Sequence, residues 1–129
     1  MNYSVLLVDN QEESLQQSTR ELKSRGLSVL GCLNYEKACE LLKKDGSIHV
    51  VLSEWELPQK ENTTSTIKGL KIFKNFMALR HEVTLFLYTH ITDSQSLTSG
   101  GIINGYFFKG EDVYDDIVRK IQAEMNDKR

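Results

Sequence analysis

The chain has 129 residues, a length that suits one domain built around one core, so residues 1–129 are predicted to form a single domain. Its composition is ordinary for a globular protein, and 16 basic against 18 acidic residues give a formal net charge of −2. This balance argues against direct binding of nucleic acid or of an anionic membrane surface. No segment approaches the roughly 20 apolar residues that span a bilayer, so we expect a cytoplasmic protein.

The first third of the chain predicts a strand, a helix and a second strand. Residues 5–8 form a short apolar run typical of a buried strand. Residues 9–25 show the spacing of an amphipathic helix, which Gly26 is suited to end. Residues 27–33 then predict the second strand.

The next stretch repeats this order and ends in a polar segment. Asn34 is suited to cap a second helix, and Gly46 is suited to close it. Residues 50–52 predict a third buried strand. Residues 59–68 are polar and rich in Thr and Ser, so they predict a loop.

The remaining residues continue the alternation of helices and strands. Residues 69–79 predict a helix and residues 83–88 a fourth strand, whereas residues 92–99 predict either a short helix or an irregular connection. Residues 105–108 predict a fifth strand, and residues 112–125 predict a last helix with one apolar face. Five apolar strands separated by helices indicate a doubly wound parallel sheet with helices on both faces.

The carboxyl ends of the strands are where sites form in such sheets. Polar side chains follow four of the five predicted strands, as the pairs Asp9-Asn10, Ser53-Glu54, Thr89-His90 and Lys109-Gly110. Two acidic groups, a hydroxyl and a lysine are therefore expected to converge in one pocket.

The cysteines do not form a pattern typical of a reactive or metal-binding site. Cys32 and Cys39 lie in apolar surroundings without CxxC spacing. We interpret them as small buried hydrophobic residues of a protein kept in a reducing compartment. No Ser/His/Asp or Cys/His nucleophile set and no zinc spacing is visible either, so we do not expect an enzyme.

In the order of its motifs, the chain resembles the response-regulator receiver domain (CheY-like) family from residue 4 to about residue 125. The segments that carry the resemblance are the first strand with its acidic pair (5–10), the second helix (36–42), the third strand with the acceptor position and a trailing proline (50–58), Gly69-Leu70, Thr89, and the fifth strand with its aromatic and its lysine (105–109). The resemblance implies a flavodoxin-like fold with strand order 2-1-3-4-5. It also implies a role in two-component (phosphorelay) signalling.

The resemblance assigns a role to each polar residue at the strand ends. In the family a histidine kinase donates a phosphoryl group to an aspartate, with help from a divalent cation, a lysine and a hydroxyl. The residues at these positions are Glu54 as phospho-acceptor, Asp9 and Asn10 as the acidic pocket, Thr89 and Tyr106 as the switch, and Lys109 as the phosphate-site lysine. Asp9, Asn10 and Glu54 are then the expected Mg²⁺ ligands, and no other cofactor is expected.

Glu54 and Asn10 depart from the family pattern. Glu is one methylene longer than Asp, so its carboxylate extends about 1.5 Å further, and such a misplacement can cost on the order of 100-fold in rate. The same length brings Glu54 nearer to Lys109, where it could imitate a phosphoryl group. A degenerate site without this bias, slow phosphorylation and Ser53 as acceptor remain alternatives. Asn10 is a weaker Mg²⁺ ligand than a carboxylate, and its alternative role is to cap the first helix.

Four functions are compatible with the sequence to different degrees. We expect a pseudo-receiver with impaired phosphorylation that binds protein partners, either a histidine kinase or a downstream output protein. A homodimer through the last helix and fifth strand is a further expectation. The alternatives are a working phosphoacceptor receiver and the receiver-like wing domain of a larger enzyme. A flavodoxin-like cofactor binder is disfavoured, because the acidic turn at residues 9–13 lacks glycine and would repel a phosphate.

Overall fold

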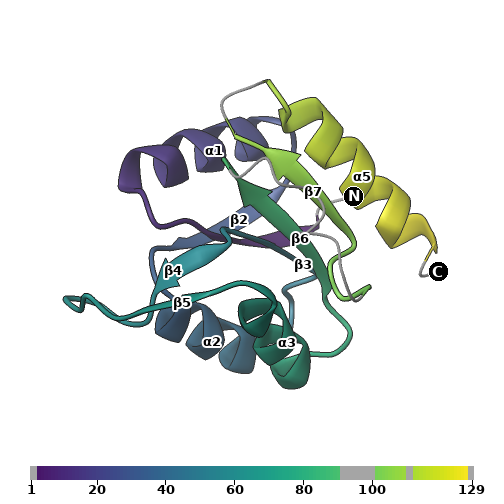
Figure 1. Cartoon of the computed structure of the whole chain (residues 1–129). Helices are drawn as coiled ribbons and strands as arrows, with labels where there is room; N and C mark the ends of the chain where they lie inside the picture. Colours follow the sequence, from purple (N-terminus) through teal and green to yellow (C-terminus); the bar gives the residue numbers. More distant parts are fainter. Residues whose placement is uncertain (1–2, 91–100, 110–111, 128–129) are drawn as a thin grey trace.

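A five-stranded parallel sheet forms the centre of the protein. The computed structural model describes residues 3–90, 101–109 and 112–127. The strands of the sheet are β1 (Ser4–Val8), β2 (Ser28–Cys32), β3 (Val50–Ser53), β6 (Thr84–Thr89) and β7 (Gly105–Phe108). They lie in the order β2-β1-β3-β6-β7, and each adjacent pair is parallel (Figure 1). Since β6 and β7 are the fourth and fifth of these strands along the chain, the expected order 2-1-3-4-5 is confirmed.

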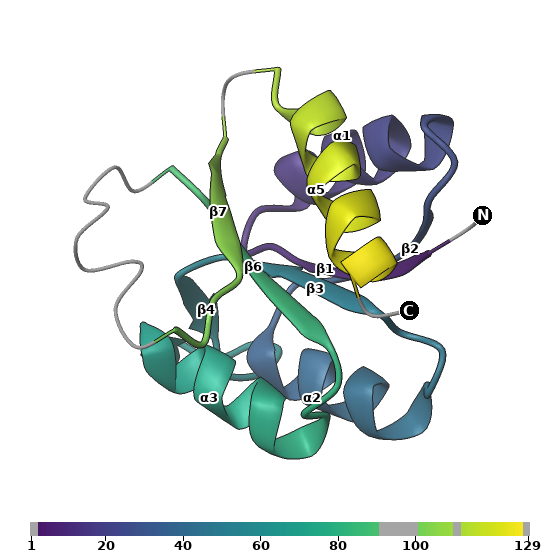
Figure 2. The same cartoon turned by 90° about the vertical axis from the view of Figure 1, so that its right-hand side faces the viewer.

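Helices cover both faces of the sheet, as predicted. The helices are α1 (Glu12–Ser24), α2 (Tyr35–Lys44), α3 (Leu70–Leu79) and α5 (Tyr114–Asp127). The sheet is seen almost edge-on in Figure 2, where α1 and α5 lie on one side and α2 and α3 on the other. This arrangement explains why the three central strands β1, β3 and β6 are almost entirely buried, because helices cover them on both faces.

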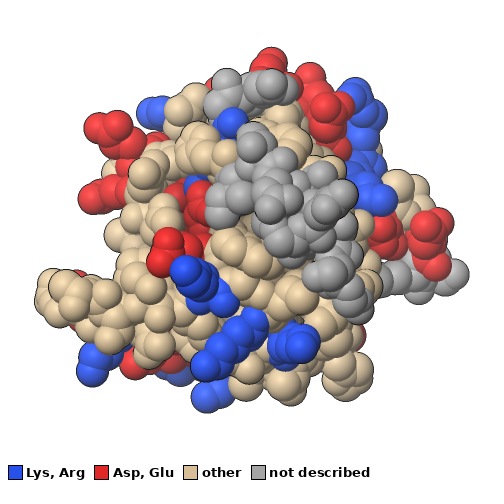
Figure 3. All heavy atoms as spheres, viewed as in Figure 1, with Lys and Arg blue, Asp and Glu red and all other residues tan. Residues whose placement is uncertain are grey.

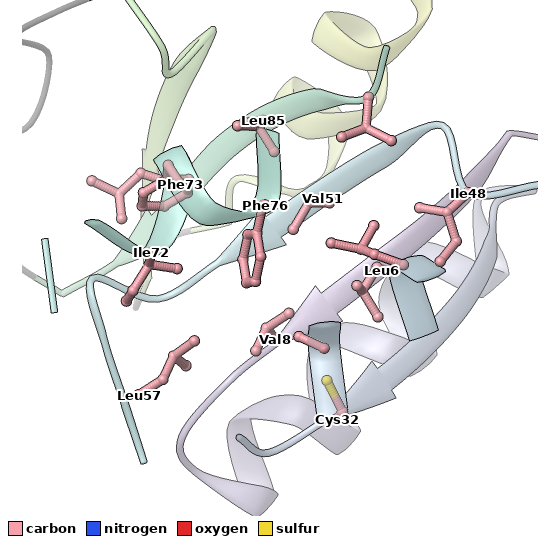
Figure 4. Close-up of a cluster of buried hydrophobic side chains, with 14 of the residues drawn as sticks. Leu6, Val8, Cys32, Ile48, Val51, Leu57, Ile72, Phe73, Phe76 and Leu85 are labelled. Carbon is pink, nitrogen blue, oxygen red and sulfur yellow. The ribbon is translucent and has the colours of Figure 1, made fainter. Parts of the chain in front are cut away.

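Alternate side chains of each strand divide the core into two halves. On β1, Leu6 and Val8 point to the half under α2 and α3, whereas Val5 and Leu7 point to the half under α1 and α5. All four side chains are buried. Figure 4 shows the first half, in which the rings of two α3 residues pack over the sheet.

Two local features explain where helices begin and end. Asn34 caps α2 as predicted, because its side-chain oxygen accepts the Lys37 N–H at 2.8 Å. After α1, Gly26 adopts a φ of 94° and donates its N–H to the Lys23 carbonyl, which ends the helix where the sequence predicted. The first helix starts at Glu12 and not at residue 9, because the Asp9 N–H still bonds to the Cys32 carbonyl and so continues the sheet.

The prediction of a loop over residues 59–68 was wrong for its last three residues. Strand β4 (Glu56–Pro58) pairs antiparallel with β5 (Thr66–Lys68), and the tip of this β4–β5 hairpin projects from the body in Figure 1. Leu57 and Ile67 lie opposite each other in this pair and are both buried in the core. Each strand contributes one buried apolar side chain, and so short an alternation is hard to recognise in a polar sequence.

Two further expectations concern residues 92–99 and membrane-spanning segments. The short helix or irregular connection predicted over residues 92–99 lies outside the described residues. Among the helices of the described ranges, none combines the length and the apolar character that crossing a membrane requires.

Candidate functional site

The sheet ladder itself brings three charged residues to one edge. The N–H of Asp9 donates to the Cys32 carbonyl, and the N–H of Glu54 donates to the Val8 carbonyl. These bonds extend the parallel pairing just beyond β1 and β3. The N–H of Lys109 donates in the same way to the Thr89 carbonyl, beyond β6 and β7. Residues that follow different strands are therefore held side by side.

Asp9, Glu54 and Lys109 form a buried ion triad at this edge. The Lys109 Nζ lies 2.6 Å from Glu54 Oε1 and 2.9 Å from Asp9 Oδ2. Asp9 is fully buried, Glu54 is 6% exposed and Lys109 is 7% exposed. One ammonium group is thus shared between two carboxylates in a site that excludes most water, where such contacts are strong but costly to desolvate.

Other donors occupy the remaining oxygens of the two carboxylates. Asp9 Oδ2 also accepts the Ser14 hydroxyl at 2.6 Å, and Asp9 Oδ1 accepts the Gln11 N–H at 3.0 Å. Glu54 Oε2 accepts the Trp55 N–H at 3.0 Å. Each carboxylate oxygen of the ion triad therefore has a donor supplied by the chain itself, which is the condition under which buried charge is tolerated.

Of the three expected metal ligands, Asp9 and Glu54 converge on Lys109, whereas Asn10 points elsewhere. The Asn10 side chain is exposed and donates to the Glu56 carbonyl at 3.0 Å, so it faces the β4–β5 hairpin. The alternative role for Asn10 was wrong, since the N-cap of α1 is Gln11 and no side chain caps this helix. Within the described ranges, no group of three or more His, Cys, Asp or Glu side chains is arranged to hold a metal ion. The present geometry, with an ammonium between two saturated carboxylates, does not fit a bound Mg²⁺.

Of the predicted switch residues, Thr89 adjoins the ion triad, and Tyr106 lies on β7 three residues before Lys109. Thr89 is buried at the end of β6 and is paired in register with Phe108, directly before Lys109. Tyr106 is half-buried, and its ring meets the Phe108 ring edge-on with centroids 5.3 Å apart. His90 is exposed.

A hydroxyl cluster beside the ion triad was not anticipated from the sequence. The Lys109 Nζ lies 5.2 Å from the centroid of the Tyr88 ring, a cation–π distance. The Tyr88 hydroxyl in turn lies 2.9 Å from Ser18 Oγ and 3.5 Å from the Tyr114 hydroxyl. Burial raises the pKa of the Tyr88 phenol, so it stays neutral at physiological pH. Ser14 and Ser18 recur four residues apart on α1, which was the available indication that this helix turns hydroxyls toward the site.

A polar cleft of about 540 Å³ opens next to these groups. Residues from α1, from the ends of β6 and β7, and from the start of α5 line it, including Ser14, Arg25, Tyr88, His90 and Lys109. The cleft therefore lies on the α1–α5 side of the site, away from the β4–β5 hairpin.

The comparison with known proteins rests on structure. No protein-family model matches the chain, and no curated protein matches it. Solved structures do: a CheY-like response regulator receiver domain protein from Methanospirillum hungatei has a TM-score of 0.81 at 15% identity, over 98% of this chain and 96% of that one. The signal receiver domain of an HD domain-containing protein from Pseudomonas fluorescens has a TM-score of 0.79 at 22% identity, over 98% and 97%.

A third solved structure was determined in complex with ligands. The response regulator protein TrrA from Thermotoga maritima, in complex with Mg²⁺ and BeF, has a TM-score of 0.77 at 20% identity, over 94% of this chain and 97% of that one. At these identities the likeness establishes the fold alone. The protein thus has the flavodoxin-like α/β fold of CheY-like response-regulator receiver domains.

Proposed function

We propose that the protein is a receiver-type module of two-component signalling that acts by binding protein partners and whose phosphorylation is impaired. The fold supports the signalling class, since its structural neighbours are receiver domains. The observation that carries the proposal of impairment is the Lys109 ammonium, held 2.6 Å from Glu54 Oε1 and 2.9 Å from Asp9 Oδ2.

This contact opposes both steps that a phosphoacceptor needs. A metal ion would need carboxylate oxygens that now accept bonds from Lys109, Ser14 and two backbone N–H groups. A nucleophile would need a free carboxylate, but both oxygens of Glu54 are engaged. We therefore expect weak Mg²⁺ binding and little or no phosphoryl transfer to Glu54.

The same contact supports a fixed, active-like state. In the family the lysine meets the phosphoryl group, and here it meets a carboxylate that carries one negative charge against about two for a phosphoryl group. Glu54 thus imitates part of the charge that phosphorylation would bring. In this proposal the module presents its partner-binding surface without needing a kinase.

The substitution Glu54→Asp tests the impairment. Removing one methylene withdraws the carboxylate by about 1.5 Å. The carboxylate then loses its contact with Lys109 and becomes available to a metal ion and to a phosphoryl donor. We expect Mg²⁺ with beryllofluoride to change Trp55 fluorescence saturably in Glu54→Asp, with an apparent affinity at least about tenfold above that of the unaltered protein. Acetyl phosphate with Mg²⁺ is expected to add a phosphoryl group to this variant, as measured by intact mass.

Glu56→Asp is the matched control. It removes the same methylene two positions away, from an exposed side chain whose carboxylate accepts the Thr66 hydroxyl and takes no part in the ion triad. This variant should behave like the unaltered protein. Efficient phosphorylation of the unaltered chain by acetyl phosphate would contradict the proposal and favour a working phosphoacceptor.

A further inference from the structure

Three lysines project from β5 and the start of α3 without any ion-pair partner. Lys68, Lys71 and Lys74, here called the lysine row, are all exposed, and none of them forms an ion pair in the described parts of the chain. Lys71 and Lys74 are three residues apart on the helix and are therefore neighbours on its surface. Figure 3 shows blue side chains gathered over the lower part of one face, where Figure 1 places β5 and α3.

The acidic residue nearest in the pairing does not neutralise the lysine row. Glu56 lies opposite Lys68 in the β4–β5 pair, yet its carboxylate accepts the Thr66 hydroxyl at 3.2 Å and forms no ion pair with Lys68. The positive charge of this face is thus left facing solvent, in a chain whose formal net charge is −2.

The position of Lys71 in the first turn of its helix is electrostatically unfavourable. The first turns of α1, α2 and α5 all carry acidic residues, which complement the positive end of a helix dipole. Helix α3 has no acidic residue in its first turn and carries Lys71 there. Elsewhere, Lys23 lies in the last turn of α1, and Lys43 and Lys44 lie in the last turn of α2, where the dipole favours cations. Lys71 therefore opposes the local preference that the other helices follow.

The lysine row is also connected to the ion triad through the backbone of Trp55. The Trp55 N–H donates to Glu54 Oε2, and the Trp55 carbonyl accepts the Gly69 N–H at 2.8 Å, one residue before α3 begins. Gly69 has a φ of 81°, and a Cβ there would lie 3.4 Å from the Trp55 ring. The start of α3 is therefore held in place by the residue that follows Glu54.

We propose that the lysine row is a docking surface for an acidic segment of a partner protein. The proposal rests on the proposed function in so far as the chain acts by binding partners, and it assigns that binding to the β5–α3 face. Exposed, unpaired cations attract such a segment and orient it, and the contact weakens with salt. A protein partner fits better than a nucleic acid or a membrane, because the whole chain is weakly acidic and would repel an extended polyanion.

Charge reversal at two of these lysines tests the proposal. Binding of a fluorescein-labelled Glu-rich peptide is measured by fluorescence anisotropy at low and physiological salt. The double variant Lys71→Glu/Lys74→Glu is expected to weaken binding by at least about tenfold. Its melting temperature should rise or stay unchanged, because acidic residues suit the start of a helix. Loss of binding together with retained stability separates a docking role from a structural one.

The double variant Lys23→Glu/Lys44→Glu is the matched control. It makes the same charge change at two exposed, unpaired lysines that close α1 and α2. We expect it to lower the melting temperature and to change peptide binding less than about twofold. Equal losses in both double variants, no binding of the peptide by the unaltered protein, or tighter binding of single-stranded DNA or phosphatidylserine vesicles would each overturn the proposal. None of these variants alters the ion triad, so this test can fail while the Glu54→Asp test succeeds.

Discussion

Lys109 places its ammonium group between two carboxylates at a buried edge of the sheet. Taking charges out of water is costly, and the contacts to Asp9, Glu54 and the Tyr88 ring offset that cost. Such a group specifies one arrangement of its neighbours, because the site cannot rearrange without exposing an unpaired charge.

Removing the Lys109 charge should therefore destabilise the protein strongly. Lys109→Met leaves two buried carboxylates without their shared partner, and we expect the free energy of unfolding to fall by about 3–5 kcal/mol in urea titrations. The control is Lys120→Met, which breaks a more exposed pair with Glu124 and should cost less than about 1 kcal/mol. Adding Glu54→Gln to Lys109→Met should recover part of the loss. Similar losses in both single variants would show that the ion triad contributes little.

Cys32 is expected to make the free energy of unfolding fall at alkaline pH. Burial is the main cause that raises the pKa of this thiol, from about 9 to about 12. The folded state therefore keeps the proton after the unfolded chain has lost it. Stability from this group is intact below about pH 9 and is lost as the pH rises toward 12, by about 1 kcal/mol per pH unit above 9.

The variant Cys32→Ala should flatten this decline. Urea unfolding of both proteins at several pH values between about 8 and 11 gives the slope of the unfolding free energy against pH for each. These slopes do not depend on the constant loss of stability that the smaller side chain causes. Cys39→Ala is the comparison: that thiol is half-buried, and burial raises its pKa as well, so this variant should flatten the decline less than Cys32→Ala does. Parallel profiles for the unaltered protein and Cys32→Ala would contradict this origin of the pH dependence.

Individual residues differed in how far they could be predicted. The contact of Glu54 with Lys109 followed from one extra methylene and from the rule that strand ends share an edge. The direction of Asn10 did not, because its partner is the carbonyl of Glu56 in a hairpin that was itself not predicted. The Tyr88 hydroxyl contacts were equally hidden, since they join residues 70 and 26 positions apart.

At the scale of elements, Arg80 forms hydrogen bonds to the segment that connects the end of α2 to the start of β3. Its guanidinium donates to the carbonyls of Leu42 and Asp45 through Nη1 and to those of Gly46 and Ile48 through Nη2, at 2.8 to 3.2 Å. The last carbonyls of a helix lack partners within the helix. Arg80 supplies them from the end of α3, so that one side chain joins three elements.

Lysine cannot replace this fork of donors. Arg80→Lys keeps the charge but loses most of the four contacts, and we expect the free energy of unfolding to fall by about 2 kcal/mol. Arg119→Lys is the matched control, because Arg119 is exposed and pairs with Asp116 on its own helix, so its loss should be below about 0.5 kcal/mol. Thermal and urea unfolding measure both. Equal stability of the two variants would mean that water replaces Arg80 adequately.

The β4–β5 hairpin shows why one pair of elements escaped prediction. Each strand has three residues and one buried side chain, so no period can be read with confidence from the sequence. Its position depends on tertiary contacts, including the bond from the Glu36 N–H to the Gln59 carbonyl at 2.9 Å. In contrast, β1, β3 and β6 of the main sheet each carry at least four consecutive buried residues.

For the whole molecule, the layered architecture followed from the alternation of buried strands and amphipathic helices. A parallel sheet needs both faces covered, and the described part of the chain supplies two helices for each face. The order of the strands came from the resemblance of short motifs to receiver domains, and it agrees with structures that share 15–22% of their residues with this chain. A shared fold at such identities does not fix the residues of a site.

The bond between Glu54 and Lys109 has a consequence for how such a module is regulated. A phosphoryl group is added and hydrolysed, whereas a glutamate side chain is installed by the ribosome and stays for the life of the protein. Under the proposed function, the strength of the output then follows the amount of protein in the cell. Synthesis and proteolysis take over the task that a kinase and a phosphatase perform for a reversible switch.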